Sequence, residues 1–241
     1  MISIRHLTRR FENLTAVSDL TVEIPTGQIV ALLGPNGAGK TTTLNMLTTM
    51  MAPTEGTALV GGFDICTEGG EVRRILGYVP EHGTLYEGLT ADEFLELAGR
   101  VRGLSKEVLN QRATEMFEFF ELTDARHQRL GTFSKGMRRK ALVAAALLHQ
   151  PKVLFLDEPM DGLDVRSQKK LGELLQQQAA SGCTVIYSSH VLQQVEELCQ
   201  EVVLIDKGCL RWQGPLAELR AAHQGAGLRD IFLQLTEEAG A

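Results

Sequence analysis

Runs of consecutive apolar residues, each about the length of one strand, recur near the start of the chain and through its second half. They cover residues 28–33, 152–156 and 183–188. A strand that is apolar on both faces belongs to a sheet that is covered on both sides. Helical patterns over 165–180 and 191–199 follow two of these runs. Strands that alternate with helices in this way predict a mainly parallel sheet packed between helices.

The first third of the chain alternates apolar and polar residues, which is the pattern of a half-buried antiparallel sheet. It predicts antiparallel strands over residues 2–6 and 16–24, ahead of the buried strand. Two short strands are expected further on, at 57–60 and 77–80. Near the other end, Lys207-Gly208 predicts the turn of a hairpin that joins 201–206 to 209–213.

Residues 81–133 show helical periodicity alone. Thr90 and Glu93 have the spacing of a capping box, and Ser105 is a second N-cap candidate. Each predicted helix carries one apolar stripe, and we interpret both stripes as core rather than as a binding groove, because amphipathic helices mostly bury their apolar face. The stripes consist of Phe94, Leu97, Ala98 and Val101 in the first helix and of Leu109, Ala113, Met116, Phe117 and Phe120 in the second.

Composition narrows the classes of function. The chain has 241 residues, 44% of them hydrophobic, and a formal net charge of -6. Nucleic-acid binding proteins normally present a basic face, so we expect no nucleic-acid partner. The basic cluster Lys135, Arg138, Arg139 and Lys140 lies at a predicted helix start, where we expect it to serve a local role.

The chain offers no sign of export or membrane insertion. Its first residues lack the apolar core of a signal peptide, and its longest clean apolar run, 141–148, is too short to span a bilayer. The 4 cysteines form no C-x-x-C pair, which favours reduced thiols. We therefore expect the chain itself to be soluble and cytosolic.

A glycine-rich loop directly follows the buried strand and precedes a helical segment that we expect to begin near Thr42. Such a loop aims successive backbone N–H groups and the positive end of a helix dipole at one point, which suits phosphate. In this P-loop pattern the lysine reaches the β- and γ-phosphates and the hydroxyl after it ligates Mg²⁺. The predicted phosphate-binding residues are Gly34, Asn36, Gly37, Ala38, Gly39, Lys40, Thr41 and Thr42.

Two adjacent carboxylates, Asp157 and Glu158, end the apolar strand at 152–156. Alongside a P-loop, Asp157 is predicted to hold Mg²⁺, and Glu158 to orient or deprotonate the attacking water. His190 directly follows the strand at 183–188, at the sheet edge where ligands of open α/β folds collect. We expect its imidazole to donate a hydrogen bond to the charge that develops on the γ-phosphate.

The order of these elements resembles the nucleotide-binding subunit of an ATP-binding cassette (ABC) transporter along nearly the whole chain. The resemblance rests on five elements taken together, which are far more specific than any one of them. In chain order they are Phe11, the P-loop, Tyr78-Val79-Pro80-Glu81, Phe133-Ser134-Lys135-Gly136-Met137, and the run from Val153 through Asp164 with His190 after it.

The resemblance implies roles that spacing alone does not show. Phe11 matches the aromatic residue that stacks on adenine. The family's signature motif, which contacts ATP held by the other subunit of a head-to-tail dimer, corresponds to Ser134, Lys135, Gly136 and Met137. Asp164 matches the loop that communicates between the two sites, and Glu81 stands where a glutamine usually links Mg²⁺ to the transmembrane subunit.

Two departures from the commonest pattern, Glu81 and the pair Lys135 with Met137, resemble the ABC-2-type branch that powers exporters with separate membrane subunits. The carboxylate of Glu81 could ligate Mg²⁺, but it also adds negative charge near the γ-phosphate. The C-terminal segment resembles the tail of that branch, and one helical face there carries Leu228, Ile231, Phe232 and Leu235.

The expected fold is α/β, a P-loop NTPase core with a mainly parallel sheet, an N-terminal antiparallel β subdomain and an inserted α-helical lobe. We expect one domain over 1–241, in which the core takes 1–80 and 134–215, the lobe 81–133 and a helical tail 216–241.

The expected function is hydrolysis of ATP with Mg²⁺ by a homodimer at the cytoplasmic face of a membrane, coupled to transport through a separate integral membrane permease. We expect a short cytoplasmic helix of the permease to dock in a groove near residues 78–89. Two alternatives stay open: a soluble cassette that acts on nucleic acid or ribosomes, and a regulatory module without turnover. A guanine-nucleotide switch is disfavoured because the chain has no Asn-Lys-x-Asp motif.

Overall fold

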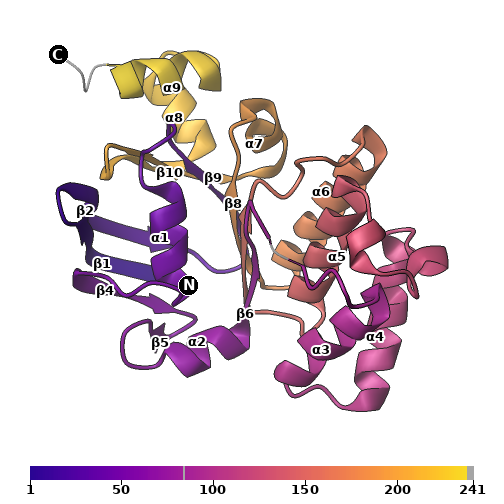
Figure 1. The fold of residues 1–241 in the computed structure, drawn as a ribbon. Helices are drawn as coiled ribbons and strands as arrows, with labels where there is room; N and C mark the ends of the chain where they lie inside the picture. Colours follow the sequence, from indigo (N-terminus) through magenta and orange to yellow (C-terminus); the bar gives the residue numbers. More distant parts are fainter. Residues whose placement is uncertain (84, 238–241) are drawn as a thin grey trace.

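A six-stranded sheet forms the centre of the computed structural model, which describes residues 1–83 and 85–237. Thr84, in the predicted lobe, and 238–241, in the predicted tail, lie outside the described residues. The strand order is β10-β9-β3-β8-β7-β6, with β10 antiparallel to β9 and the other neighbours parallel (Figure 1). The bounds are β3 Ile29–Leu33, β6 Leu76–Val79, β7 Val153–Asp157, β8 Thr184–Ser188, β9 Glu201–Asp206 and β10 Cys209–Pro215.

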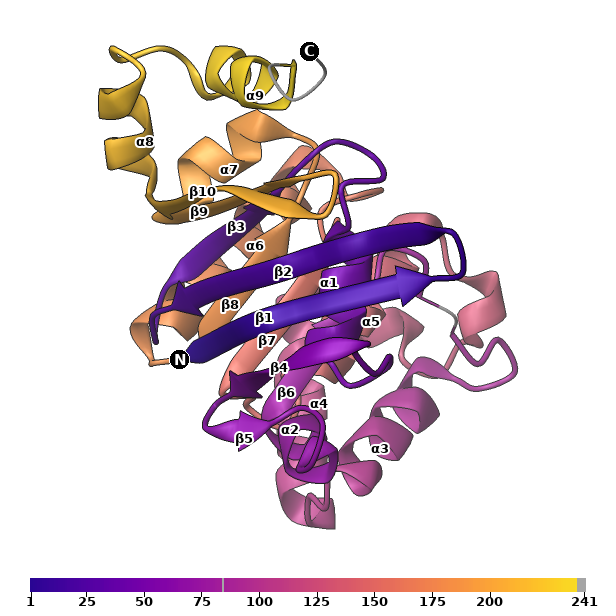
Figure 2. The ribbon, with the colours of Figure 1, turned by 90° about the vertical axis from the view of Figure 1, so that its left-hand side faces the viewer.

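A second, antiparallel sheet is built by the N-terminal part of the chain in the order β2-β1-β4-β5. Its long hairpin turns between Phe11 and Leu14, which face each other as the last pair of the β1–β2 ladder. Figure 2 shows this hairpin running across the molecule in front of α1. The bounds are β1 Ile2–Phe11, β2 Leu14–Ile24, β4 Glu55–Val60 and β5 Phe63–Asp64.

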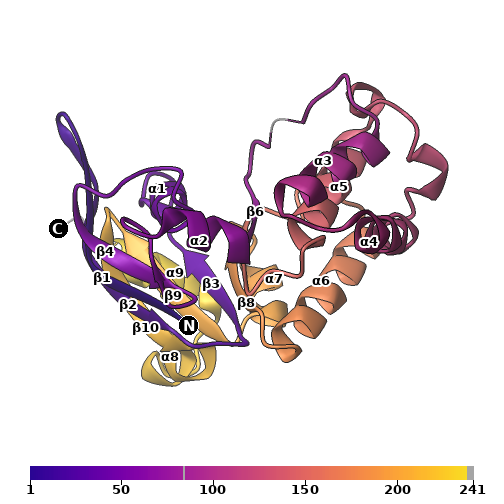
Figure 3. The same ribbon diagram turned by 90° about the horizontal axis from the view of Figure 1, so that it is seen from below.

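Helices cover both faces of the six-stranded sheet. Figure 3 shows α1 and α2 on the side of the antiparallel sheet, and α3, α4, α5 and α6 on the other side. The helices are α1 Lys40–Leu47, α2 Gly69–Ile75, α3 Ala91–Val101, α4 Lys106–Phe119, α5 Lys135–Leu147, α6 Val165–Ala180, α7 Leu192–Leu198, α8 Leu216–Ala222 and α9 Leu228–Glu237, with short 3-10 turns at Thr123–Ala125 and Leu130–Thr132.

Strand β3 separates two hydrophobic cores. Ile29, Ala31 and Leu33 pack into the core shared with the helical side of the molecule. Val30 and Leu32 pack into the core between the two sheets. Because successive side chains of a strand point to opposite faces, a strand buried on both sides must be apolar at every position. The uninterrupted apolar run at this place in the sequence therefore has a direct structural reason.

The first apolar stripe of the lobe is exposed, so our interpretation of it as core was wrong. Leu97 is 41% exposed and Val101 76% exposed, whereas Ala91, Leu95 and Gly99 are the buried residues of α3. A Cβ at Gly99 would overlap the side chain of Leu109. Helix α3 therefore buries the face that carries Ala91, Leu95 and Gly99, with Gly99 against Leu109 of α4, and leaves Leu97 and Val101 on the surface.

Other local predictions are confirmed. Thr90 and Glu93 form a complete capping box, and Ser105 accepts a hydrogen bond from the backbone N–H of Val108. The second stripe is core, with Phe117 only 1% exposed. In the tail, Leu228 and Ile231 are both 0% exposed.

The sequence patterns missed two short elements, β5 and α2, which are too brief to show a clear period. Within the described ranges, no helix is both long enough and apolar enough to cross a bilayer.

Candidate active site

The glycine-rich loop connects β3 to α1, and the helix begins at Lys40, two residues before the expected start. Gly39 precedes the helix with φ +102°, a conformation that suits glycine, and a Cβ there would collide with the backbone oxygen of Ala16. The first-turn N–H groups of a helix have no intrahelical partner. Those of Lys40, Thr41 and Thr42 are therefore available to an anion.

Lys40 spans the glycine-rich loop. Its Nζ donates to the backbone oxygens of Gly34 at 2.7 Å and Pro35 at 3.1 Å. Burial lowers the pKa of Lys40, and the nearby carboxylates of Asp157, Glu158 and Glu81 oppose this shift. A half-buried ammonium group among carboxylates is placed to neutralise a phosphate that enters the loop.

Asp157 ends β7 directly beside the first turn of α1. The hydroxyl of Thr41 donates to Asp157 Oδ2 at 3.3 Å, and Asp157 is 3% exposed. Burial raises the pKa of Asp157, and repulsion from Glu81 and Glu158 adds to this, while the hydrogen bond from Thr41 opposes it.

These oxygens fit Mg²⁺, which prefers hydroxyl, carboxylate, phosphate and water oxygens. A cation would also relieve the mutual repulsion of the carboxylates. No group of three or more His, Cys, Asp and Glu side chains suited to a metal occurs in the described part of the chain. Thr41 and Asp157 would supply part of a Mg²⁺ shell, and substrate phosphates and water would supply the rest.

Glu158 is held by the end of the neighbouring strand. Its Oε1 accepts a hydrogen bond from the backbone N–H of His190 at 2.7 Å, and its Oε2 accepts from Ser189 Oγ at 3.2 Å. The imidazole Nδ1 of His190 lies 2.8 Å from Oε1. The backbone of Glu158 itself has φ +50°, and its N–H donates to the oxygen of Ser188. The carboxylate is therefore held by three polar groups: the backbone N–H and the imidazole of His190, and the hydroxyl of Ser189.

An open cleft of about 580 Å³ joins these groups. Of the predicted loop residues, Gly34 and Ala38 do not line it: Gly34 contributes only its backbone oxygen to Lys40, and Ala38 is 2% exposed beneath the loop. Leu14 and Ala16 line the cleft without having been predicted. The lining consists of Phe11, Leu14, Ala16, Asn36, Gly37, Gly39, Lys40, Thr41, Thr42, Glu81, Asp157, Glu158 and His190.

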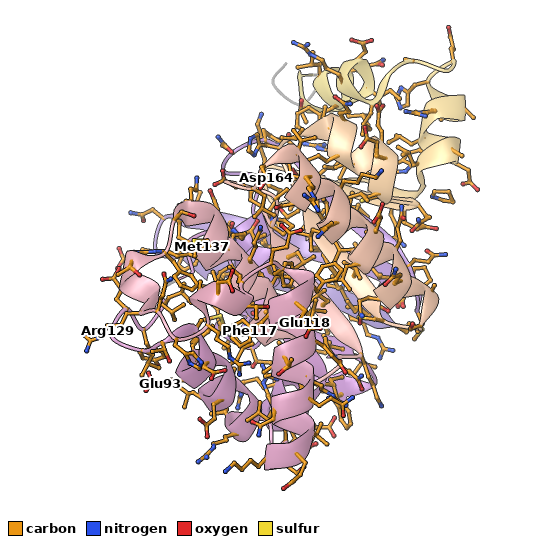
Figure 4. The ribbon with its side chains drawn as sticks, turned by 90° about the vertical axis from the view of Figure 1, so that its right-hand side faces the viewer. Glu93, Phe117, Glu118, Arg129, Met137 and Asp164 are labelled. Carbon is orange, nitrogen blue, oxygen red and sulfur yellow. The ribbon has the colours of Figure 1, made fainter. Side chains whose placement is uncertain are left out.

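The predicted signature residues lie together but outside this cleft. Ser134 caps α5 by accepting from the backbone N–H of Met137 at 3.2 Å. A Cβ on Gly136 would lie 2.7 Å from the oxygen of Gly162. Asp164 caps α6, accepting from the backbone N–H of Ser167 at 2.9 Å. Figure 4 shows Met137 and Asp164 near one edge of the molecule, on the starts of their two helices.

The basic cluster at the start of α5 serves local contacts, as predicted. Lys135 Nζ pairs with Asp161 Oδ2 at 2.7 Å, and Arg138 pairs with Glu87 at 3.0 Å. Arg139 is 5% exposed and donates to the backbone oxygens of Pro80 and Glu81, both at 2.8 Å. Arg139 therefore connects α5 to the segment that carries Glu81, which lines the cleft.

A second hollow, of about 480 Å³, opens between the exposed stripe of α3 and the start of β6. We call it the lobe groove. Its lining is mainly apolar, with Arg73 and Arg102 among it. The apolar members are Met50, Leu76, Tyr78, Tyr86, Phe94, Leu97, Ala98, Val101, Leu142, Ala145 and Ala146.

A phosphate-binding loop, a strand-end Asp-Glu pair and a cleft that joins them define a nucleoside triphosphatase of the P-loop class. The family model described as ABC transporter matches residues 17–161. The chain belongs to the ABC transporter family and is one of its ATPase cassettes.

Relatives with the same domain are known from bacteria. An uncharacterized ABC transporter ATP-binding protein of Bacillus subtilis, YxlF, is 40% identical over 93% of this chain and 74% of its own length. The daunorubicin/doxorubicin resistance ATP-binding protein DrrA of Streptomyces peucetius is 37% identical over 90% of this chain and 66% of its own length.

Solved structures share the whole architecture. An ATP-binding subunit of an ABC transporter superposes with a TM-score of 0.93 at 31% identity, covering 98% of this chain and 99% of its own. The dimeric structure of MJ0796, a bacterial ABC transporter cassette, gives a TM-score of 0.83 at 25% identity, covering 90% of this chain and 99% of its own. The predicted α/β fold is therefore confirmed, and dimeric assembly is known in the family.

Proposed function

We propose that this chain is the ATP-hydrolysing subunit of an exporter, acting as a homodimer on a separate integral membrane permease. The observation that carries the proposal is the separation of two half-sites in one chain. The P-loop, Asp157 and Glu158 lie in the cleft, whereas Ser134 and Gly136 lie outside it. A second copy placed head to tail would bring its signature residues to this cleft.

In the proposed site, ATP stacks its adenine on Phe11, which is 37% exposed at the cleft. The triphosphate lies against the backbone N–H groups of the loop, with Lys40 close to the β- and γ-phosphates. Thr41, Asp157 and Glu81 would hold Mg²⁺, either directly or through water. When bound, Mg²⁺ supplies positive charge that offsets the charge of the transferred phosphoryl group.

Glu158 takes the proton of the attacking water in the proposed reaction. Its contacts with Ser189 and His190 fix the carboxylate without neutralising it. In the proposed reaction the imidazole of His190, 75% exposed at the rim, leaves its contact with Glu158 Oε1 and donates a hydrogen bond to the γ-phosphate.

The second subunit completes the proposed site. Its Ser134, Lys135, Gly136 and Met137 would face the γ-phosphate, because the start of α5 presents a helix N-terminus to an anion. We assign to Asp164, at the start of α6 beside these residues, the role of reporting the state of one site to the other. ATP therefore holds the dimer closed until it is hydrolysed.

The lobe groove is the proposed contact with the permease. It exposes an apolar stripe on α3, and exposed contiguous apolar surface marks interaction sites. A short cytoplasmic helix with an apolar face fits such a groove. Docking there places the subunit on the cytoplasmic side of the membrane, and the drug-resistance relative supports export as the direction.

Replacing the proposed general base tests the core of this proposal. We expect Glu158→Gln to bind ATP normally, to lose about 100-fold or more of its turnover, and to accumulate an ATP-bound dimer on size exclusion with Mg²⁺. Glu173→Gln, on the exposed face of α6, is the matched control and should behave as wild type. A Glu158→Gln protein that stays monomeric with ATP and Mg²⁺ would contradict the two-subunit site.

A further inference from the structure

The guanidinium group of Arg9 lies over the ring of Phe11, with its carbon 4.6 Å from the ring centroid. The two residues are two positions apart on β1, so their side chains leave the strand on the same face. Phe11 lines the cleft and Arg9 does not. Arg9 therefore contacts the Phe11 ring from outside the cleft.

Arg9 is anchored as well as stacked. Its Nη1 donates to the backbone oxygen of Ala52 at 2.9 Å. Ala52 lies shortly after α1, the helix that begins at the phosphate loop. One side chain thus ties the hairpin end that carries Phe11 to the segment that follows α1. Its Nε is buried without a hydrogen-bond partner among the described residues, so the carbonyl and the ring are what locate the group.

The neighbouring Arg10 makes different contacts, so the contact with Phe11 is specific to position 9. Arg10 points to the other face of β1 and pairs with both carboxylate oxygens of Glu55. The side chains of Arg10 and Glu55 are both exposed. Arg9 and Arg10 thus have the same charge on the same strand, but only Arg9 touches Phe11.

We infer that Arg9 is a positioning residue for adenine recognition: it holds the Phe11 ring so that its free face is presented to the base. This inference rests on the proposed stacking of adenine on Phe11. A ring at a hairpin end would otherwise turn about its side-chain bonds, and ordering it would weaken binding. A cation over one face removes that freedom before ATP arrives. Adenine then stacks on a ring whose orientation is already fixed.

A double-mutant cycle tests the inference by steady-state ATPase assays. We expect Arg9→Met to raise KM for ATP about two- to tenfold with kcat unchanged. In a Phe11→Ala background the same substitution should add nothing, because Arg9 acts only through the ring. Arg10→Met is the matched control and should leave KM unchanged. Inorganic tripolyphosphate should inhibit wild type and Arg9→Met equally, because it has no base.

Arg9→Lys provides a second variant if the methionine protein folds poorly. It keeps the charge but not the planar stacking group, so its KM should lie between the other two. The inference is overturned if Arg9→Met raises KM as much without Phe11 as with it, or if it weakens tripolyphosphate inhibition equally. Failure of the proposed function is distinguishable, because Phe11→Ala alone would then leave KM for ATP unchanged.

Discussion

The imidazole Nδ1 of His190 lies 2.8 Å from Glu158 Oε1, the oxygen that also accepts the backbone N–H of His190 at 2.7 Å. Strand register creates this pairing. Asp157 of β7 stands opposite Ser188 of β8 in the parallel ladder, so the residues that follow each strand meet at the same sheet edge. The two groups are 32 residues apart in sequence. Their contact gives Glu158, the proposed general base, a partner that also lines the cleft.

Removing the imidazole should slow turnover without weakening ATP binding. We expect His190→Ala to lower kcat by about 10- to 100-fold, less than Glu158→Gln, because residue 190 keeps the backbone N–H that holds Glu158. Phosphate release at saturating ATP measures this. His127→Ala is a control with a similarly exposed imidazole, 77% against 75%. An unchanged kcat in His190→Ala would exclude the histidine from the reaction.

Removing the lysine of the loop should abolish nucleotide binding. Lys40→Ala deletes the ammonium group that bridges two loop oxygens and faces the carboxylates, and we expect ATP affinity to fall by at least about 2 kcal/mol. Equilibrium titration with a fluorescent ATP analogue reports the change. Lys169→Ala, on exposed α6, should bind as wild type does. If both variants bind equally well, the loop is not the phosphate site.

A charge in the lobe groove should detach the subunit from its membrane partner. Leu97→Glu puts a carboxylate on the exposed apolar stripe of α3, and the cost of removing this charge from water opposes the docking of an apolar helix. We expect at least about a tenfold loss of the protein from the membrane fraction of cells that contain the permease. Leu233→Glu on α9 is the matched control, since Leu233 is 42% exposed and Leu97 41%. Equal loss in both variants would point to a general folding defect.

Stability should fall on mild acidification because of His149. Burial, with help from Arg102, lowers the pKa of His149 from 6.5 to about 4, while its Nε2 hydrogen bond to the oxygen of Leu76 opposes the shift. The unfolded chain therefore takes up this proton first as the pH falls. The contribution of His149 is complete above about pH 6.5 and is lost progressively toward pH 4.

The free energy of unfolding should decrease by about 2 kcal/mol from this one group, after allowance for partial exposure. Urea titrations at several pH values between 4 and 7.5 measure it. His149→Gln keeps a donor for the Leu76 oxygen but has no proton to gain, so its stability should depend less on pH. The same pH slope in both proteins would show that His149 is not the titrating group.

Several structural features of this protein could be predicted from residues that are neighbours in the sequence. The loop from Gly34 to Thr41 is defined by contiguous residues, and the caps Thr90 and Ser105 act within one helical turn. Strand β3 could be predicted because burial on both faces makes all five of its residues apolar. Features of this kind depend on neighbours in the chain, so a pattern is enough to predict them.

Only the tertiary structure decided which surfaces were buried and which distant groups met. The apolar stripe of α3 lines a groove because the helix packs inward through the face that carries Ala91, Leu95 and Gly99. Leu14 lines the cleft because the hairpin places it opposite Phe11. The tertiary structure likewise brings Arg9 to the ring of Phe11 and to the backbone oxygen of Ala52. These outcomes depend on steric fit between elements and on strand register, which hydrophobic periodicity does not encode.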